Sequence, residues 1–288
     1  IWPAELIGCG TRFDELFKEE KVQEFVLPYD VPANEFLNLE GQKISGSRNW
    51  AVWGKDFLSR YDPDAFRYYL TSIMPESRDS DWDWEEFYHR NNDELVATWG
   101  NLANRVLSFA YKYWEGIVPD PGQLTEIDEA LLATIEVGFD NVGKELEQVH
   151  LRAALAEVMR LASEVNKYLD QTSPWRTIKE DKQTAARAIF VAMKAIDSLK
   201  IMFAPFLPFT SQQLHEFFGN GTSLFGSQFT ETVKDELGEH VILRYNPTHA
   251  TGKWKASELQ PGSKFEKPTP LFKKLDASII TEERERLG

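Results

Sequence analysis

The sequence predicts a mainly α-helical protein, in which an antiparallel helix bundle follows a small α/β part. Three observations predict this fold class. Apolar residues recur at spacings of three and four from Leu95 to Ala110 and in three later segments, which is the period of amphipathic helices. Short connections between these segments favour antiparallel neighbours. Before residue 54, short apolar runs instead alternate with turn residues, as they do in strands.

The first 53 residues are expected to form short strands and turns. Apolar runs occupy residues 24–28 and 35–39. The second run enters Glu40-Gly41, and an acidic residue followed by Gly is a hairpin signal. The loop at 43–49 comes next, and its small and hydroxyl-bearing residues predict a mobile, polar connection.

Two helix starts are expected before the bundle. Asp62 and Pro63 provide an N-cap and a proline at the first helical position, and the helix should end near Pro75. Asp83 is a second N-cap, and Glu86 three residues later completes a variant of the capping box. Capping also explains the pair Asp81 and Asp83 better than a role in acid–base catalysis does.

The bundle is expected to hold several long helices. The first starts at Trp84, buries Leu95, Trp99, Leu102, Val106 and Ala110, and stops near Gly116. Three more are expected at about 125–139, 149–169 and 184–203, with Pro205 and Pro208 breaking or kinking the last of them. A short helix is expected at 211–218. After Gly221 a strand at 240–245, an extended Pro-rich segment at 267–274 and a charged helix at 281–287 follow. The predicted domains are therefore 1–90, 91–221 and 222–288.

Composition excludes several classes of protein. The formal net charge is −14 over 288 residues, which argues against a nonspecific coat on nucleic acid such as DNA but allows a local site. No apolar run is long enough to cross a bilayer. Cys9 is the single cysteine and the five histidines are scattered, so we expect no disulfide and no metal site. These features fit a reducing cytoplasm.

One short motif could serve chemistry on a phosphate. Lys43, Ser45, Gly46 and Ser47 form a small, hydroxyl-bearing loop with a cation at its edge. Such a loop can approach a triphosphate and stabilise the charge of its leaving group. When these residues are taken alone, an ordinary surface turn with a solvated lysine explains them better.

Two further motifs could serve RNA recognition. Asn101 and Arg105 are four residues apart and share a helix face beside the apolar stripe, where they could read an unpaired base. Pro174 and Trp175 follow a helix end, and a tryptophan on a rigid loop can stack on a splayed base. The alternatives are a hydrogen bond between helices for the first pair and a buried core residue for Trp175.

The order of these motifs resembles the C-terminal half of methionyl-tRNA synthetases, which are class I enzymes. Segment 34–45 reads Asn-Glu-Phe-Leu-Asn-Leu-Glu-Gly-Gln-Lys-Ile-Ser and is similar to the strand and turn that lead into the family's second signature, Lys-Met-Ser-Lys-Ser. Segment 62–70 resembles the linker helix that follows. Residues 100–105, 168–175 and the Ala-Pro-Phe-Leu-Pro kink at 204–208 then occur in the family's order.

The resemblance implies ligation of methionine to tRNA, with ATP and Mg²⁺, through methionyl-adenylate. The signature loop closes over the pyrophosphate, and Lys43, Ser45 and Ser47 match its first lysine and its hydroxyls. Gly46 replaces the second signature lysine, so Lys43 and backbone amides would carry more of the ATP contact. Asn101, Arg105, Pro174 and Trp175 match positions that contact the anticodon, which is CAU in methionine tRNA.

The resemblance also implies that catalytic parts are missing. The family's first ATP signature, His-Ile-Gly-His, does not occur in these 288 residues, and the sequence opens at Ile1 without Met. The domains are then the end of a catalytic domain at 1–90, an anticodon-binding bundle at 91–221 and an extension at 222–288. We expect no ATP or methionine site to be retained by the chain alone. A stand-alone tRNA-binding module and a helical scaffold for protein partners are the alternatives.

Overall fold

The computed structural model describes residues 30–235 and 238–287. The chain divides into two compact units, residues 1–34 and 35–288, and every helix and strand described here belongs to the second unit. The strand predicted at 24–28 and Cys9 lie outside the described residues.

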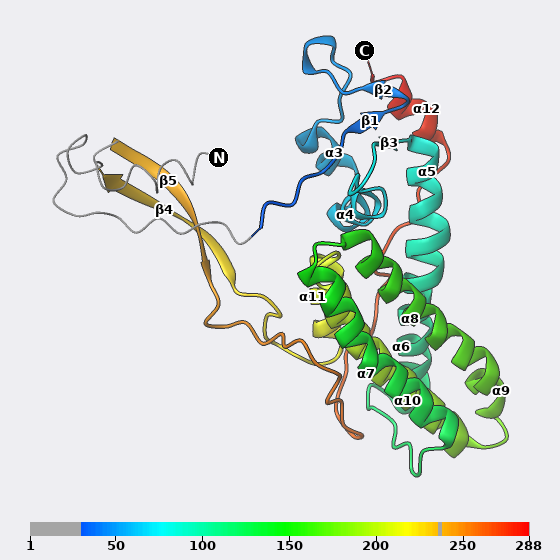
Figure 1. Cartoon of the computed structure of the whole chain (residues 1–288). Coiled ribbons are helices and arrows are strands. Elements are labelled where there is room, and N and C mark those ends of the chain that lie inside the picture. Colours follow the sequence, from blue (N-terminus) through cyan, green and yellow to red (C-terminus); the bar gives the residue numbers. More distant parts are fainter. Residues whose placement is uncertain (1–29, 236–237, 288) are drawn as a thin grey trace. The chain divides into compact units, whose positions relative to one another are not determined.

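A small three-stranded sheet begins the second unit (Figure 1). Strand β1 (Leu37–Leu39) pairs antiparallel with β2 (Gln42–Lys43) and parallel with β3 (Ser80–Trp82). Glu40 and Gly41 have φ angles of 48° and 72° at the turn between β1 and β2, so the predicted hairpin is confirmed. The carboxylate of Asp81 accepts the Gly41 N–H at 2.9 Å, which gives Asp81 a structural role.

Two short helices enclose an aromatic core beside this sheet. They are α3 (Gly54–Arg60), which the sequence did not predict, and α4 (Pro63–Ser72). Helix α4 starts as predicted, with the Asp62 side chain accepting the Asp64 N–H at 2.8 Å and Pro63 as the first residue. The core residues are Phe57, Tyr69, Trp82, Trp84 and Phe87.

One long helix leads from this core into the bundle. It consists of α5 (Trp84–His89), a π-helical segment η3 (Arg90–Gly100) and α6 (Asn101–Trp114), which follow one another without a break. The Asp83 carboxylate caps it by accepting the Glu86 N–H at 2.7 Å. The Glu86 side chain bonds Arg90 instead of reaching back, so only half of the predicted capping box forms. The predicted apolar stripe is buried.

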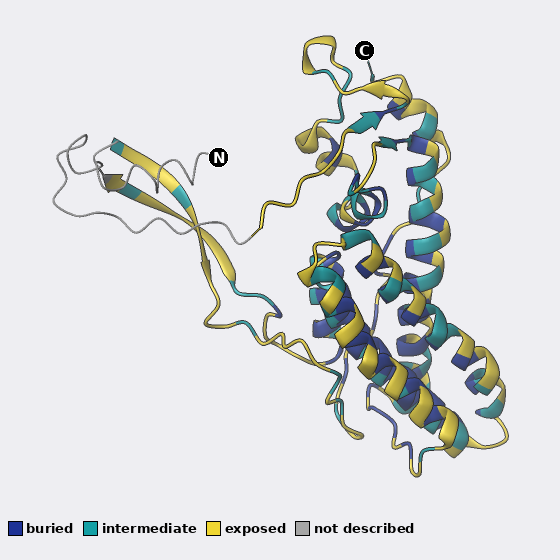
Figure 2. Cartoon of the chain, viewed as in Figure 1, coloured by how far each residue is buried: buried dark blue, intermediate teal, exposed yellow. Residues whose placement is uncertain are grey.

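The remaining helices complete an antiparallel bundle, as predicted. They are α7 (Glu126–Glu147), α8 (Leu151–Thr172), the short α9 (Pro174–Thr177), α10 (Lys182–Phe203) and α11 (Pro208–Phe217). Helix α7 packs on α8, and α10 packs on both. Figure 2 shows buried residues along one side of α7 and exposed residues along its other side, which is the pattern of an amphipathic helix.

After α11 the chain forms a hairpin of β4 (Ser227–Asp235) and β5 (Gly238–Asn246). Strand β5 covers the predicted strand, whereas β4 was not predicted. An irregular segment then runs back along the long helix, where the Asn92 amide donates to the Leu275 carbonyl and its carbonyl accepts the Leu275 N–H, both at 2.9 Å.

Helix α12 (Ser278–Arg284) returns the chain to the aromatic core. Its Glu283 is buried and accepts hydrogen bonds from Arg60 at 2.9 Å and Tyr61 at 2.8 Å. These hydrogen bonds attach the C-terminal segment to the end of α3. Within the described residues, no helix combines the length and apolarity needed to span a membrane.

Candidate nucleic-acid interface and phosphate loop

The loop after β2 is anchored at its base. Ser45 and Trp50 exchange two backbone hydrogen bonds, at 2.8 and 2.9 Å, and a short 3-10 turn, η2 (Gly46–Arg48), lies between them. The Trp50 indole N–H donates to the Leu39 carbonyl at 2.8 Å, which attaches the loop to β1. The loop therefore has a more regular backbone than the polar connection expected from the sequence.

The side chains that matched the phosphate motif lie on this loop. Lys43, Gly46 and Ser47 are exposed and Ser45 is half-buried. The hydroxyl oxygens of Ser45 and Ser47 are 3.3 Å apart. The Lys43 amine lies 5.8 Å from the ring centroid of Phe36. A flexible amine and two adjacent hydroxyls at an exposed turn are groups that can bind phosphate oxygens.

The backbone at Gly46 does not require glycine. A Cβ built there would come no closer than 3.5 Å to the Trp53 ring, which is an ordinary van der Waals distance, and no positive φ is found at this position. A lysine at position 46 would therefore fit the same turn, so the departure from the family's signature reflects side-chain choice and not backbone strain.

The RNA motifs meet on the bundle. Asn101 and Arg105 are both exposed and lie one turn apart on α6. The Arg105 guanidinium lies over the Trp175 ring, 4.6 Å from its centroid, and donates to the side-chain amide oxygen of Asn166 at 3.1 Å. Asn166 in turn donates to the Thr98 carbonyl at 3.2 Å. The Arg105 guanidinium is thus positioned by two contacts, one with the Trp175 ring and one with the Asn166 side chain.

Helix α9 presents Trp175. Ser173 has a φ of 43°, which turns the chain out of α8, and Pro174 is the first residue of α9. Trp175 is half-buried and packs partly against the bundle core, so it is neither fully sealed nor fully exposed. Pro174 is buried. Its ring orients the tryptophan beside it, and a direct contact of Pro174 with RNA stays a prediction.

These residues form a site with mixed chemistry. It offers a planar guanidinium stacked on an indole, with the exposed Asn101 amide one turn away. Hydrogen bonding to base edges and stacking on flat groups are how proteins read unpaired RNA bases. Asn166 lies on α8 between the buried Val165 and Tyr168. The sequence did not lead us to single it out as a site residue, although an amide on an amphipathic helix was a usable signal.

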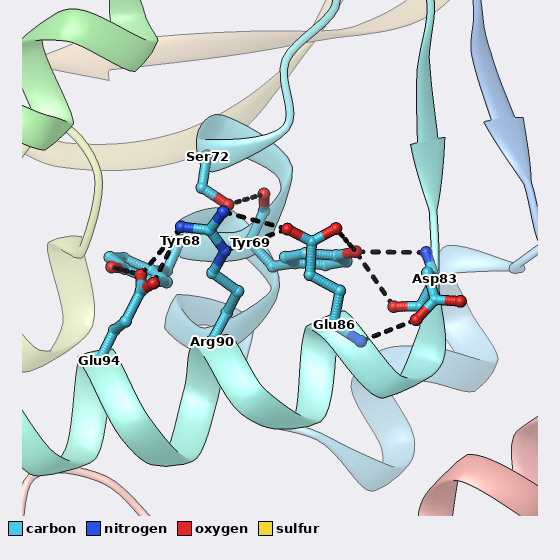
Figure 3. A network of polar contacts seen from close by, with 7 residues as sticks. All are labelled: Tyr68, Tyr69, Ser72, Asp83, Glu86, Arg90 and Glu94. Carbon is cyan, nitrogen blue, oxygen red and sulfur yellow. Dashed lines mark hydrogen bonds and ion pairs between the residues drawn. The ribbon is translucent and has the colours of Figure 1, made fainter.

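A polar network braces the helix that carries this site (Figure 3). The Tyr68 hydroxyl on α4 donates to Glu94 at 2.7 Å, and Arg90 bonds Glu94 at 2.9 Å and Glu86 at 3.0 Å. Burial and the neighbouring Glu94 carboxylate raise the pKa of Tyr68. The network ties α4, which follows the loop, to the long helix that ends at Trp114. Its sequence signal was the i, i+4 spacing of Glu86, Arg90 and Glu94.

Comparisons with known families agree with this arrangement. A family model described as "tRNA synthetases class I (M)" matches residues 1–107. A second, described as "Anticodon binding domain of methionyl tRNA ligase", matches residues 118–242. The class that they define is that of class I tRNA synthetases.

Individual relatives show which kind of class I tRNA synthetase this chain is similar to. Methionine–tRNA ligases of Thermomicrobium roseum and Roseiflexus castenholzii are 52% and 48% identical to this chain over its full length. The chain belongs to the methionyl-tRNA synthetase family. It spans about half the length of these curated relatives, 47% and 46% respectively.

Solved structures share the fold. The free Mycobacterium tuberculosis methionyl-tRNA synthetase aligns with a TM-score of 0.70 and 22% identity, covering 96% of this chain and 46% of that one. The same enzyme bound by methionyl-adenylate aligns with a TM-score of 0.72 and 22% identity, covering 94% of this chain and 46% of that one. The predicted fold class, a bundle after a small α/β part, is confirmed.

Proposed function

We propose that this chain recognises the anticodon of a methionine tRNA as part of a methionine–tRNA ligase. The observation that carries the proposal is the set formed by the exposed Asn101 and Arg105 and the half-buried Trp175, in which the guanidinium lies 4.6 Å from the indole centroid. A base inserted beside this pair could stack on it while Asn101 and Arg105 bond its edge. The CAU triplet is the sequence that we expect these groups to read.

The side chains of the bundle and of the loop favour this proposal over the two alternatives. A helical scaffold for proteins gives no reason for a guanidinium stacked on an indole beside an exposed amide. A stand-alone RNA-binding module gives no reason for the loop at 43–47. We place the protein in the cytoplasm, where tRNA is charged.

For the loop, we propose contact with the phosphates of ATP. The Lys43 amine and the Ser45 and Ser47 hydroxyls would stabilise the departing pyrophosphate when methionine attacks the α-phosphate. The backbone of Gly46 would approach the phosphates more closely than a side-chain-bearing residue allows. Mg²⁺ would arrive with ATP, and we assign it no protein ligand. ATP–pyrophosphate exchange by the 288-residue chain alone, which we expect to be absent, would show that the chain needs no further catalytic part.

Substitutions on helix α6 test the anticodon proposal. Asn101→Ala and Arg105→Gln should each weaken binding of a methionine-tRNA transcript by about tenfold, because each removes hydrogen bonds to an unpaired base. Asn104→Ala is the control, since Asn104 lies on the same helix and accepts only the Ser108 hydroxyl at 3.3 Å. Equal affinity of all four proteins for the transcript would remove the assignment.

A further inference from the structure

A patch of aromatic rings continues the helix face beyond Arg105. We call Phe109, Tyr113 and Trp114 the aromatic patch. Phe109 and Tyr113 have ring centroids 4.5 Å apart, and Trp114 lies 6.2 Å from Phe109 and 6.3 Å from Tyr113. All three rings are half-buried, so each keeps some surface open to solvent.

Two lysines flank the aromatic patch. The Lys112 amine lies 5.2 Å from the Tyr113 ring centroid, and the Lys182 amine lies 5.7 Å from that of Trp114. Both lysines are exposed, and they come from different helices, α6 and α10. Although the whole chain carries a net charge of −14, this surface therefore combines cations with open ring faces.

Packing alone accounts for only part of the aromatic patch. Phe109 and Trp114 pack against the bundle core, so their inner edges stabilise the fold. That role does not need a lysine beside Tyr113 or a second lysine from α10 beside Trp114. Aromatic faces flanked by cations are, in contrast, how proteins hold single-stranded nucleic acid: the rings stack on bases and the cations meet phosphates.

The aromatic patch is in register with the proposed anticodon site. Asn101, Arg105, Phe109 and Tyr113 follow one another at intervals of four along α6, so each lies next to the one before it, in a row that turns gradually around the helix by about 40° per step. Eight residues separate Arg105 from Tyr113, which is about 12 Å along the axis. An unpaired strand that meets Arg105 and Trp175 could thus continue along α6 onto the patch.

We propose that the aromatic patch is a second stacking site for RNA, which takes an unpaired nucleotide directly flanking the triplet. The inference rests on the proposed function and extends it. Any base would suit the site, because every base has a flat face and stacking on a ring does not depend on the hydrogen bonds at the base edge. Lys112 and Lys182 would contact the phosphates on either side of that nucleotide.

A set of synthetic hairpin RNAs tests the second site with the full chain. One hairpin carries CAU in its loop, and two others lack the base directly 5′ or directly 3′ of the triplet. The proteins are the wild type, Tyr113→Leu and the control Tyr113→Phe, which keeps a flat ring. The wild type and Tyr113→Phe should each bind one of the two abasic hairpins at least about fivefold more weakly than they bind the intact hairpin. Tyr113→Leu should show almost no difference between them.

The outcomes separate this inference from the proposed function. A fourth hairpin differs from the first only in an altered triplet. If it binds the wild type as tightly as the CAU hairpin does, anticodon recognition itself is contradicted. If the triplet matters but neither abasic hairpin binds the wild type more weakly, only the second stacking site is wrong. Lys112→Gln leaves all rings in place, so it covers the case in which Tyr113→Leu does not fold. It should reduce the slope of log affinity against log salt by about 0.7, and an unchanged slope would overturn the phosphate contact.

Discussion

Single side chains decide what the bundle can bind. Trp175 is held between the core and the Arg105 guanidinium, and Pro174 beneath it is buried. The sequence indicated Asn101, Arg105 and Trp175 separately, through helix spacing and a proline-led turn. It could not show that Arg105 covers the indole, because that contact joins residues 70 positions apart whose approach depends on packing of three helices.

Replacing Trp175 should therefore weaken RNA binding more than it weakens the fold. Trp175→Ala removes a stacking surface, and we expect methionine-tRNA affinity to fall by about 5- to 100-fold, as for the loss of one base–aromatic contact. Trp175→Phe should retain most of the affinity. Trp254→Ala is the control, since Trp254 packs on Phe139 of α7. Equal losses from Trp175→Ala and Trp254→Ala in a filter-binding titration would contradict a specific role for Trp175.

A buried histidine should make stability depend on pH. Burial, helped by the nearby Lys200 amine, lowers the pKa of His215 from 6.5 to about 4. As the pH falls from 6.5 to 4, the unfolded chain takes up a proton at this imidazole that the folded chain does not, so the folded state loses stability. The free energy of unfolding should fall more steeply over this range for the wild type than for His215→Gln.

Denaturant titrations at several pH values measure this difference. His249→Gln is the matched control, because His249 is exposed. That control should keep the slope of the wild type. Parallel slopes for the wild type and His215→Gln would show that His215 is not the group that titrates.

At the scale of elements, helices were predicted better than the segments between them. Helices α7, α8 and α10 could be predicted from apolar residues on one face and from caps such as Thr125. Strand β4 gives no such signal, because nearly all its residues are exposed and its apolar residues do not mark a buried face. The π-helical segment was also missed, because buried residues in it such as Asn91, Leu95 and Trp99 still recur at intervals of four, as they do on an α-helix.

The docking of α12 could not be predicted because it is a long-range contact. Glu283 bonds Arg60 and Tyr61, more than 220 positions earlier in the chain. Nothing in the sequence distinguishes Glu283 from the other acidic residues of this charged helix as the one that is buried. Only the folded chain brings the tail back along the long helix, where Asn92 holds the Leu275 backbone.

This contact makes a stability prediction. Glu283→Gln removes the charge that Arg60 and Tyr61 share, which should lower the free energy of unfolding by about 1–3 kcal/mol. It should also make the tail cleavable under limited proteolysis. The control Glu282→Gln, one residue earlier and exposed, should change neither quantity. If both variants match the wild type in urea titrations, the ion pair does not hold α12 in place.

For the whole molecule, charge and fold have separate roles. A net charge of −14 repels RNA over most of the surface, so binding must come from a few placed groups and not from a basic coat. The network of Tyr68, Arg90 and Glu94 connects the loop-bearing part to the long helix on which Asn101 and Arg105 lie. The predicted domain limits, 1–90, 91–221 and 222–288, stay a prediction, and the long helix runs across the first of them.

The central claim is that this bundle reads an anticodon. The most direct measurement is a binding titration of the chain with two transcripts of methionine tRNA, identical except in the CAU triplet, at one fixed salt concentration. We predict that altering the triplet weakens binding by at least about tenfold, the equivalent of 1.4 kcal/mol. Equal dissociation constants for the two transcripts would contradict the account.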